Sequence, residues 1–300
     1  MKVVLDCDPG HDDAIALLLA LASPEVELLG VTTVHGNQVL EKTTDNALRV
    51  LELVGRSDVP VAAGADRPLV RDLHVAAHVH GESGLDGPEL PAATARPVEQ
   101  HAVDFLLEHV TPGVVLVPVG PLTNVALAID RGLRPDRIVL MGGAIAEGNM
   151  TPAAEFNIWA DPEAAQRVFH AGVPVTMLGL DVTHRALLTP AWADRFRAAG
   201  RVGTFVAELV EFFKRYHART YGWDGAPIHD ALALAHAFHP GLVRTERVNV
   251  EVELDSELCR GRTVVDLWHR TERPPNADVG VEVDGDAFLE LLLERIGSLD

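Results

Sequence analysis

The chain has 300 residues, of which 47% are hydrophobic and 23% are charged. These fractions are ordinary for a globular protein and exclude a disordered, collagen-like or coiled-coil chain. The 44 acidic and 25 basic side chains give a formal net charge of −19. Because such a charge repels phosphate groups, we expect no nucleic acid and no anionic membrane surface among its partners.

The cysteines and the apolar runs indicate a cytoplasmic protein. The two cysteines, Cys7 and Cys259, are too few for a disulfide framework or a zinc cage, and they fit a reducing compartment. The longest uncharged run, residues 110–129, contains three prolines and is therefore not expected to span a membrane. Only oxygen and nitrogen ligands remain for a metal ion.

Strand-like and helical patterns alternate along the first part of the chain. Residues 2–5 are an apolar run, and apolar side chains then recur at helical spacing from residue 14 to residue 21. A β-branched run at residues 26–34 precedes a second helical pattern at residues 47–54. Further strand-like runs follow at residues 114–119, 138–141 and 173–178. This alternation predicts an α/β fold with a doubly wound, mainly parallel open sheet (Rossmann-like) and helices on both faces.

Two long segments interrupt this alternation. Residues 66–97 and 142–162 are predicted to be loops over a site. After residue 189 the pattern is mainly helical to about residue 238. Strand-like runs at residues 248–254, 263–267 and 279–283 then precede a terminal helix. No linker divides the chain, so residues 1–300 are predicted to form a single domain.

The topology predicts where a ligand would bind. In an open parallel sheet, ligands bind outside the carboxyl ends of the strands. Asp8 follows the first predicted strand, Asn37 follows the second, and Val119 ends the third. Asn149 lies in the loop after the fourth strand. We therefore expect one crevice to collect residues that are far apart in the sequence.

Four carboxylates crowd the first of these loops, at residues 6, 8, 12 and 13. Such crowding is costly unless a cation neutralises it or protons are retained. Taken singly, Asp12 and Asp13 could be first-turn residues of a helix, and Asp8 a helix cap. Taken together, they favour a hard cation such as Ca²⁺ or Mg²⁺. The pair His78 and His80 lacks a third ligand and is typical of a solvated loop.

Other polar residues are open to two interpretations. Asn149, Glu155 and Asn157 suit a hydroxyl-rich ligand such as a sugar, although turn formation alone would also explain them. Asp230 begins a helical pattern, where an acidic residue is ordinary. The remaining histidines, including those at 170, 217 and 239, are interpreted as surface or core residues. No phosphate-binding loop or dinucleotide turn follows the first strand.

Read together, these residues resemble the inosine-uridine-preferring nucleoside hydrolase family. Its hallmark is the motif Asp-x-Asp-Pro-Gly-x-Asp-Asp-Ala, which is complete here at residues 6–14. Further matches, in family order, are His35-Gly36-Asn37, His80-Gly81 with Gly84-Leu85, Val119-Gly120-Pro121-Leu122-Thr123-Asn124, Gly142-Gly143, residues 149–162 and His229-Asp230-Ala231. The resemblance covers residues 2 to about 296 and implies hydrolysis of the N-glycosidic bond of ribonucleosides to a free base and ribose.

The resemblance also implies roles for individual residues. One Ca²⁺ would be held by Asp8, Asp13, Asp230 and the backbone carbonyl of Val119, and Asp8 would be the general base for the attacking water. Ribose would be bound, or the water positioned, by Asp12, Asn37, Asn149, Glu155 and Asn157. His229, with His80 as a second candidate, would face the leaving base. Members of the family are usually dimers or tetramers, so a homo-oligomer is expected.

The histidines expected to face the leaving base indicate a substrate preference. A histidine near its ordinary pKa of about 6.5 can protonate a departing base at neutral pH. Two histidines favour pyrimidine nucleosides or a mixed inosine and uridine preference. Two alternatives remain open: a calcium-dependent nucleoside or sugar binder on the same fold, and a haloacid-dehalogenase-type phosphatase in which Asp6 is the nucleophile.

Overall fold

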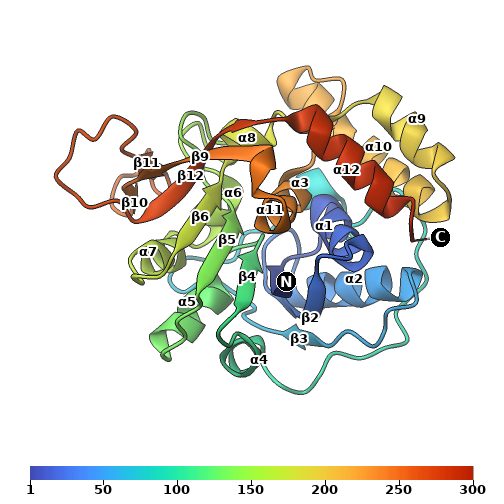
Figure 1. The fold of residues 1–300 in the computed structure, drawn as a ribbon, viewed down its shortest axis with the longest axis horizontal. Helices are drawn as coiled ribbons and strands as arrows, with labels where there is room; N and C mark the ends of the chain where they lie inside the picture. Colours follow the sequence, from blue (N-terminus) through green and yellow to red (C-terminus); the bar gives the residue numbers. More distant parts are fainter. Residues whose placement is uncertain (300) are drawn as a thin grey trace.

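The computed structural model describes residues 1–299 and contains a central eight-stranded sheet (Figure 1). Each neighbouring pair of strands is parallel except β12 and β9. Across the sheet the strands are β3 (Val61–Ala63), β2 (Glu27–Thr33), β1 (Lys2–Cys7), β4 (Val114–Pro118), β5 (Arg137–Met141), β6 (Val175–Leu178), β12 (Ala277–Val283) and β9 (Val243–Val248). The strand order runs in opposite directions on the two sides of β1, so the switch point where ligands bind lies beside this strand.

Helices cover both faces of the sheet, which confirms the predicted doubly wound α/β fold (Figure 1). The larger helices are α1 (His11–Ala22), α2 (Leu40–Leu53), α4 (Ala102–His109), α5 (Thr123–Asp130), α7 (Pro162–Phe169), α9 (Pro190–Ala198), α10 (Arg201–Tyr221), α11 (His229–Phe238) and α12 (Gly285–Ile296). The short ones are α3 (Ala77–His80), α6 (Phe156–Ala160), α8 (Leu180–Thr183) and η1 (Pro240–Leu242). Two small sheets pair β7 (Leu187–Leu188) with β8 (Ala226–Pro227) and β10 (Val250–Val252) with β11 (Thr263–Val265).

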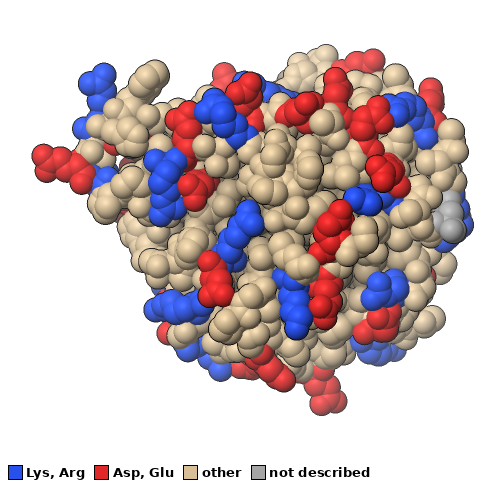
Figure 2. Space-filling view, viewed as in Figure 1, with Lys and Arg blue, Asp and Glu red and all other residues tan. Residues whose placement is uncertain are grey.

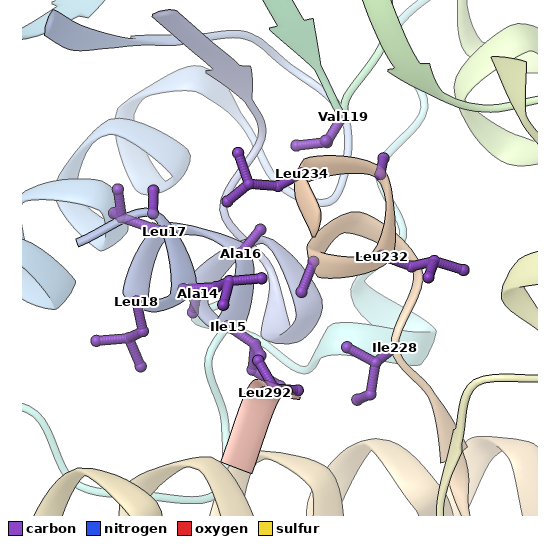
Figure 3. Close-up of a cluster of buried hydrophobic side chains, with 14 of the residues drawn as sticks. Ala14, Ile15, Ala16, Leu17, Leu18, Val119, Ile228, Leu232, Leu234 and Leu292 are labelled. Carbon is purple, nitrogen blue, oxygen red and sulfur yellow. The ribbon is translucent and has the colours of Figure 1, made fainter. Parts of the chain in front are cut away.

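Helix α1 is buried in the hydrophobic core. Residues 11–20 of this helix are all buried, because it lies between the sheet, α11 and α12 (Figure 3). Leu17 and Leu18 are fully buried there, and replacing either with Ala is expected to cost about 2–5 kcal/mol. This packing fixes the amino-terminal end of α1, which carries Asp12 and Asp13.

The second helix begins earlier than its apolar pattern predicts, at Leu40 rather than near residue 47. Its first turns bury polar side chains whose hydrogen-bonding groups are satisfied. The hydroxyl of Thr43 donates to the carbonyl of Val34 at 2.9 Å, and the amide of Asn46 donates to the carbonyl of Pro9 at 2.9 Å. Apolar periodicity cannot detect a helix face that is buried in this way.

The strand predicted at residues 248–254 is divided in the structure between β9 and β10, which belong to separate sheets. Asn249 lies between them, and its carbonyl accepts a hydrogen bond from the N–H of Asp266, while its side chain donates to Pro274. These contacts turn the chain away from the central sheet.

The helices and the surface charges can be compared with the expectation that membranes and nucleic acids are poor partners. Within residues 1–299 no helix has the length and apolar character needed to cross a bilayer. On the face in Figure 2, lysine and arginine side chains are interspersed with aspartate and glutamate side chains. No continuous basic stripe crosses this view.

Candidate active site

A cavity lies where the sequence predicts a crevice. The polar lining residues include Asp12, Asn37, Asn149, Glu155, Asn157 and Asp230. The lining also includes the rings of His80, Phe213, Tyr216, His217, Tyr221 and His229. The fold therefore brings together residues from both long loops, α1, α10 and α11.

Asp8 is held at the end of β1 and is only 1% exposed. Its Oδ2 accepts a 2.6 Å hydrogen bond from the main-chain N–H of Asn37. Glycines make this close approach possible, because a Cβ at Gly36 or at Gly120 would lie 2.1 or 2.4 Å from a carboxylate oxygen of Asp8. Its Oδ1 is buried and has no hydrogen-bond partner within residues 1–299. The structure thus anchors one oxygen of Asp8 and leaves the other uncompensated.

Asp13 has a structural role that is compatible with ion binding. Its Oδ1 accepts from the N–H of Asp8, and its Oδ2 accepts from the N–H of Gly10, both at 3.0 Å. Asp13 therefore lies in the first turn of α1, as one interpretation of the sequence proposed, and its side chain accepts from the N–H of Gly10, the N-cap residue. The interpretation of Asp8 as the helix cap is wrong, because Gly10 occupies that position. The side chain of Asn37 also donates to Oδ2 of Asp13 at 3.0 Å.

Three carboxylates in this region could hold a metal ion. Asp12, Asp13 and Asp230 each offer an oxygen within 4.8 Å of the oxygens of the other two. Two of them, Asp13 and Asp230, were expected as ligands, whereas Asp12 was expected to bind ribose. The Val119 carbonyl accepts a 2.8 Å hydrogen bond from the side chain of Asn157 and retains a second lone pair. The ligand roles of Asp8 and Val119 remain predictions.

Burial and mutual repulsion disfavour ionisation of these carboxylates. Burial, and next the charge of Asp13, raises the pKa of Asp8 and of Asp12 well above the usual range. Burial, and next the charges of Asp12, Asp13 and Asp8, raises the pKa of Asp230 in the same direction. A cation at this position would oppose both effects. Because the available donors are all oxygen atoms, the site fits a hard divalent cation.

The loop after β5 supplies amide and carboxylate groups that are held by the backbone. Glu155 caps α6, since its Oε1 accepts from the N–H of Asn157 at 2.9 Å and its Oε2 from the N–H of Gly143 at 2.8 Å. Burial raises the pKa of Glu155 to about 7. Oδ1 of Asn149 accepts from the N–H of Phe156 at 2.9 Å. All three predicted loop residues line the cavity.

The two predicted base-facing histidines lie on the cavity wall, 5% and 7% exposed. The interpretation of His80 as part of a solvated loop is wrong, because its ring stacks on Phe213 with 5.2 Å between centroids; His78 is exposed. Nδ1 of His229 lies 2.7 Å from the hydroxyl of Thr183. Burial, and next the neighbouring histidines, lowers the pKa of His80 and of His229 well below the usual range, so neither has the ordinary value assumed from the sequence.

An aromatic cluster on α10 and the loop after it was missed at the level of sequence. His217, interpreted there as a surface or core residue, is buried and hydrogen-bonded to the carbonyl of Phe213, yet it lines the cavity. Its ring stacks on Trp223 at 6.0 Å, and Trp223 stacks on Tyr221 at 4.5 Å. The only sequence signal is the spacing of Phe213, Tyr216 and His217, which share one helix face. That spacing is equally typical of a buried core.

Buried carboxylates, amides and rings that line one cavity at the switch point of an α/β sheet define an enzyme site for a small polar ligand. The model of the inosine-uridine preferring nucleoside hydrolase family matches residues 3–290, and the chain belongs to this family. The enzyme assignment and the family resemblance are thereby confirmed. The phosphatase alternative is not supported.

Individual relatives agree with this assignment. The chain is 50% identical to the pyrimidine-specific ribonucleoside hydrolase RihA of Klebsiella pneumoniae, over 99% of this chain and 98% of the relative. It is also 50% identical to the protein of that name from Escherichia coli, with the same coverage. Among solved structures, the purine-preferring ribonucleoside hydrolase from Gardnerella vaginalis aligns with a TM-score of 0.93 and 36% identity, covering 100% of this chain and 99% of that one.

Proposed function

We propose that this enzyme is a calcium-dependent N-ribohydrolase that cleaves the N-glycosidic bond of ribonucleosides and prefers pyrimidine nucleosides. The observation that carries this proposal is that one cavity is lined both by carboxylate and amide side chains and by aromatic and histidine rings. Ribose, with its hydroxyl groups, matches the carboxylates and amides, and a flat heterocyclic base matches the rings. The pyrimidine preference is supported by relatives named pyrimidine-specific at 50% identity.

The proposed ion is Ca²⁺, held by Asp8, Asp13, Asp230 and the carbonyl of Val119. Two features support it: the unpartnered Oδ1 of Asp8 and the raised pKa of the neighbouring buried carboxylates. When bound, the ion supplies positive charge that neutralises these groups and orients the ribose hydroxyls. Asp12 lies close enough to Asp13 and Asp230 to contribute as well.

The protein side chains account for the remaining chemistry. Breaking an N-ribosidic bond develops positive charge on the ribosyl group, which the surrounding carboxylate and amide oxygens stabilise. Asp8 is the carboxylate that accepts the proton of the attacking water. Asp12, Asn37, Asn149, Glu155 and Asn157 bind the ribose or position that water. His229 and His80 face the leaving base.

The same features argue against nucleotides as substrates. The net charge of −19 and the absence of a phosphate-binding loop both oppose binding of a 5′-phosphate. A 2′-deoxynucleoside should also react poorly. Its missing hydroxyl would leave buried polar groups of the site without a partner, and such a loss is costly in the transition state.

A ribonucleoside panel tests this proposal. Release of ribose is measured with uridine, cytidine and inosine, and with uridine 5′-monophosphate and 2′-deoxyuridine as controls. We expect the two pyrimidine ribonucleosides to react fastest and the controls to react poorly. Equal rates with uridine and its 5′-monophosphate would contradict the ribose assignment. Nucleoside binding without release of ribose would favour the binder alternative.

The ion is tested separately by removal and return. Dialysis against a chelator should abolish activity, and Ca²⁺ should restore it better than Zn²⁺, because the donors are all oxygen atoms. Full activity in the chelated protein would contradict calcium dependence while leaving the substrate assignment intact.

Assembly and location are the last parts of the proposal. We propose a homo-oligomer, dimer or tetramer, on the basis of the family resemblance, and light scattering at several concentrations tests it. We also propose a cytoplasmic location, because two cysteines are too few for a disulfide framework.

A further inference from the structure

The loop after β5 is fastened to a distant part of the chain by one side chain, that of Thr263. The hydroxyl of Thr263 accepts a 2.9 Å hydrogen bond from the N–H of Ala144 and donates one of 2.7 Å to the carbonyl of the same residue. The two residues are 119 positions apart in the sequence. A hydroxyl has one proton to donate and lone pairs that accept, so both contacts form at once. Thr263 therefore holds both main-chain polar groups of Ala144.

The residue before Ala144 contacts a side chain of the site. The N–H of Gly143 donates to Oε2 of Glu155 at 2.8 Å. The other backbone donors to this carboxylate belong to α6, the helix that Glu155 caps. Within residues 1–299, Gly143 is thus the one described donor to Glu155 from outside that helix. The position of its N–H determines how the carboxylate is turned relative to α6.

Gly143 fits against Thr263 and needs an external anchor. Its φ of +77° lies in the left-handed region, which favours glycine. A Cβ at this position would lie 2.9 Å from Cγ2 and 3.0 Å from Oγ1 of Thr263, so only a glycine allows Thr263 to approach. Because glycine loses more conformational freedom on ordering than any other residue, a fixed neighbour is needed to hold it. The hydroxyl of Thr263 provides that neighbour.

Thr263 acts from behind the site, without lining the cavity. It lies on β11, which Figure 1 shows outside the central sheet, and it is 2% exposed. Among residues 1–299, those that line the cavity do not include it. The same segment contacts the helices beside the loop. A Cβ at Gly261 would lie 2.8 Å from Cα of Trp159 on α6, and Arg260 forms an ion pair with Glu163 on α7. Any effect of Thr263 on a ligand must therefore pass through the main chain of the loop.

We propose that Thr263 is a positioning residue: by holding Ala144 through its hydroxyl, it fixes the N–H of Gly143 and thereby orients the carboxylate of Glu155 for ribose. This inference rests on the proposed function for the identity of the ligand. The order that Thr263 gives to the loop exists before any substrate binds. It can therefore be measured independently of activity.

Hydrogen exchange of backbone amides tests the effect on the loop. In the wild-type protein, the amides of Gly143 and Ala144 should exchange slowly with water. Thr263→Val keeps the shape of the side chain but removes the hydroxyl, so both amides should exchange about 10-fold faster, as expected for the loss of one hydrogen bond. Thr263→Ser keeps the hydroxyl and should retain most of the protection. Equal protection in the wild-type protein and in Thr263→Val would overturn the proposal.

The control is a second threonine whose hydroxyl contacts only the main chain of its own helix region. The hydroxyl of Thr204 donates to the carbonyl of Gly200 at 2.9 Å, at the start of α10. Thr204→Val should leave the exchange of both loop amides and the activity unchanged. If Thr263→Val does not fold, Thr263→Ala removes the same hydroxyl without adding a methyl group, and it should give the same exchange result.

Kinetics on uridine test whether Thr263 acts through Glu155. Thr263→Val should lower kcat/KM by about 10-fold to 100-fold, because a small displacement of a positioned group is costly, and Thr263→Ser should recover most of this loss. In a protein that already carries Glu155→Ala, the same change should cost less than about 2-fold. Equal losses in the two backgrounds would mean that Thr263 only stabilises the fold, and would overturn the proposal. If Thr263 protects the loop amides but no ribonucleoside is cleaved, the loop role stands and the proposed function fails.

Discussion

The main-chain N–H of Asn37 donates a 2.6 Å hydrogen bond to Oδ2 of Asp8, while Oδ1 of the same carboxylate is buried without a partner in residues 1–299. Asn37 comes from the loop after β2 and Asp8 from the loop after β1. The parallel pairing of these two strands therefore sets the orientation of the carboxylate. One oxygen is used for positioning, and the other is available to accept a proton.

Asp8→Asn should abolish most of the activity without unfolding the protein. The amide can turn its oxygen toward the N–H of Asn37, so the anchor survives, but no carboxylate remains to accept a proton. We expect kcat on uridine to fall by about 10² to 10⁴-fold, the usual contribution of a general base. Asp6→Asn is a matched control, since Asp6 is equally buried and also has one carboxylate oxygen without a partner in residues 1–299, while its Oδ1 accepts from Thr32 and Asn124. A similar loss in both variants would contradict the assignment of Asp8.

Asp13→Ala should act through ion binding and through the first turn of α1. Calcium affinity, measured by calorimetry, should fall, and activity should partly return at high calcium concentration, which Asp8→Asn should not show. Because Asp13 accepts from Gly10 and Asp8, its loss should also lower the free energy of unfolding by about 0.5–2 kcal/mol in the presence of a chelator. An unchanged calcium affinity would remove Asp13 from the ligand set.

His229→Ala tests assistance to the leaving group. If Thr183 donates to Nδ1, then Nε2 of His229 carries the proton that faces the base. Because burial lowers the pKa of His229, the neutral ring acts by donating a hydrogen bond to the charge that develops on the base. Loss of this donor should cost about 10² to 10³-fold on uridine and far less on p-nitrophenyl riboside, whose leaving group needs no such donor. The same comparison for His80→Ala shows which histidine serves this role. Equal losses on both substrates would mean that the histidine only positions the substrate.

Glu155 should make the ion-free protein less stable as the pH rises. Its pKa is about 7 in the folded state because of burial, above the ordinary value of 4.5. Between these two values the folded state retains a proton that the unfolded state has released. The free energy of unfolding therefore falls as the pH rises through this range, by at most about 1.4 kcal/mol per pH unit.

Glu155→Gln should remove that part of the pH dependence, because an amide does not titrate. Urea unfolding at a series of pH values in a chelator measures it. The exposed Glu89 provides the control through Glu89→Gln, which should keep the wild-type slope. Identical slopes in the wild-type protein and in Glu155→Gln would show that Glu155 is already ionised in the folded state.

Much of the architecture could be read from local patterns. The apolar runs before Asp8 and Asn37 predict strands of a parallel sheet, and such sheets place ligands at the carboxyl ends of their strands. The crowding of carboxylates between residues 6 and 13 identifies the chemistry of the site before any contact is known. These inferences succeed because periodicity, chain turns and local charge density depend on neighbouring residues only.

The remaining features depend on tertiary packing. No local rule brings Asp230 close to Asp13, because that contact arises from α1 packing against α11. Likewise, Nδ1 of His11 meets Nδ1 of His80 only because the loop before α4 folds over α1. The aromatic cluster on α10 has the same sequence spacing as an ordinary buried helix face. What makes it part of a site is the cavity beside it, and a cavity is set by how the elements pack rather than by the residues of any one of them.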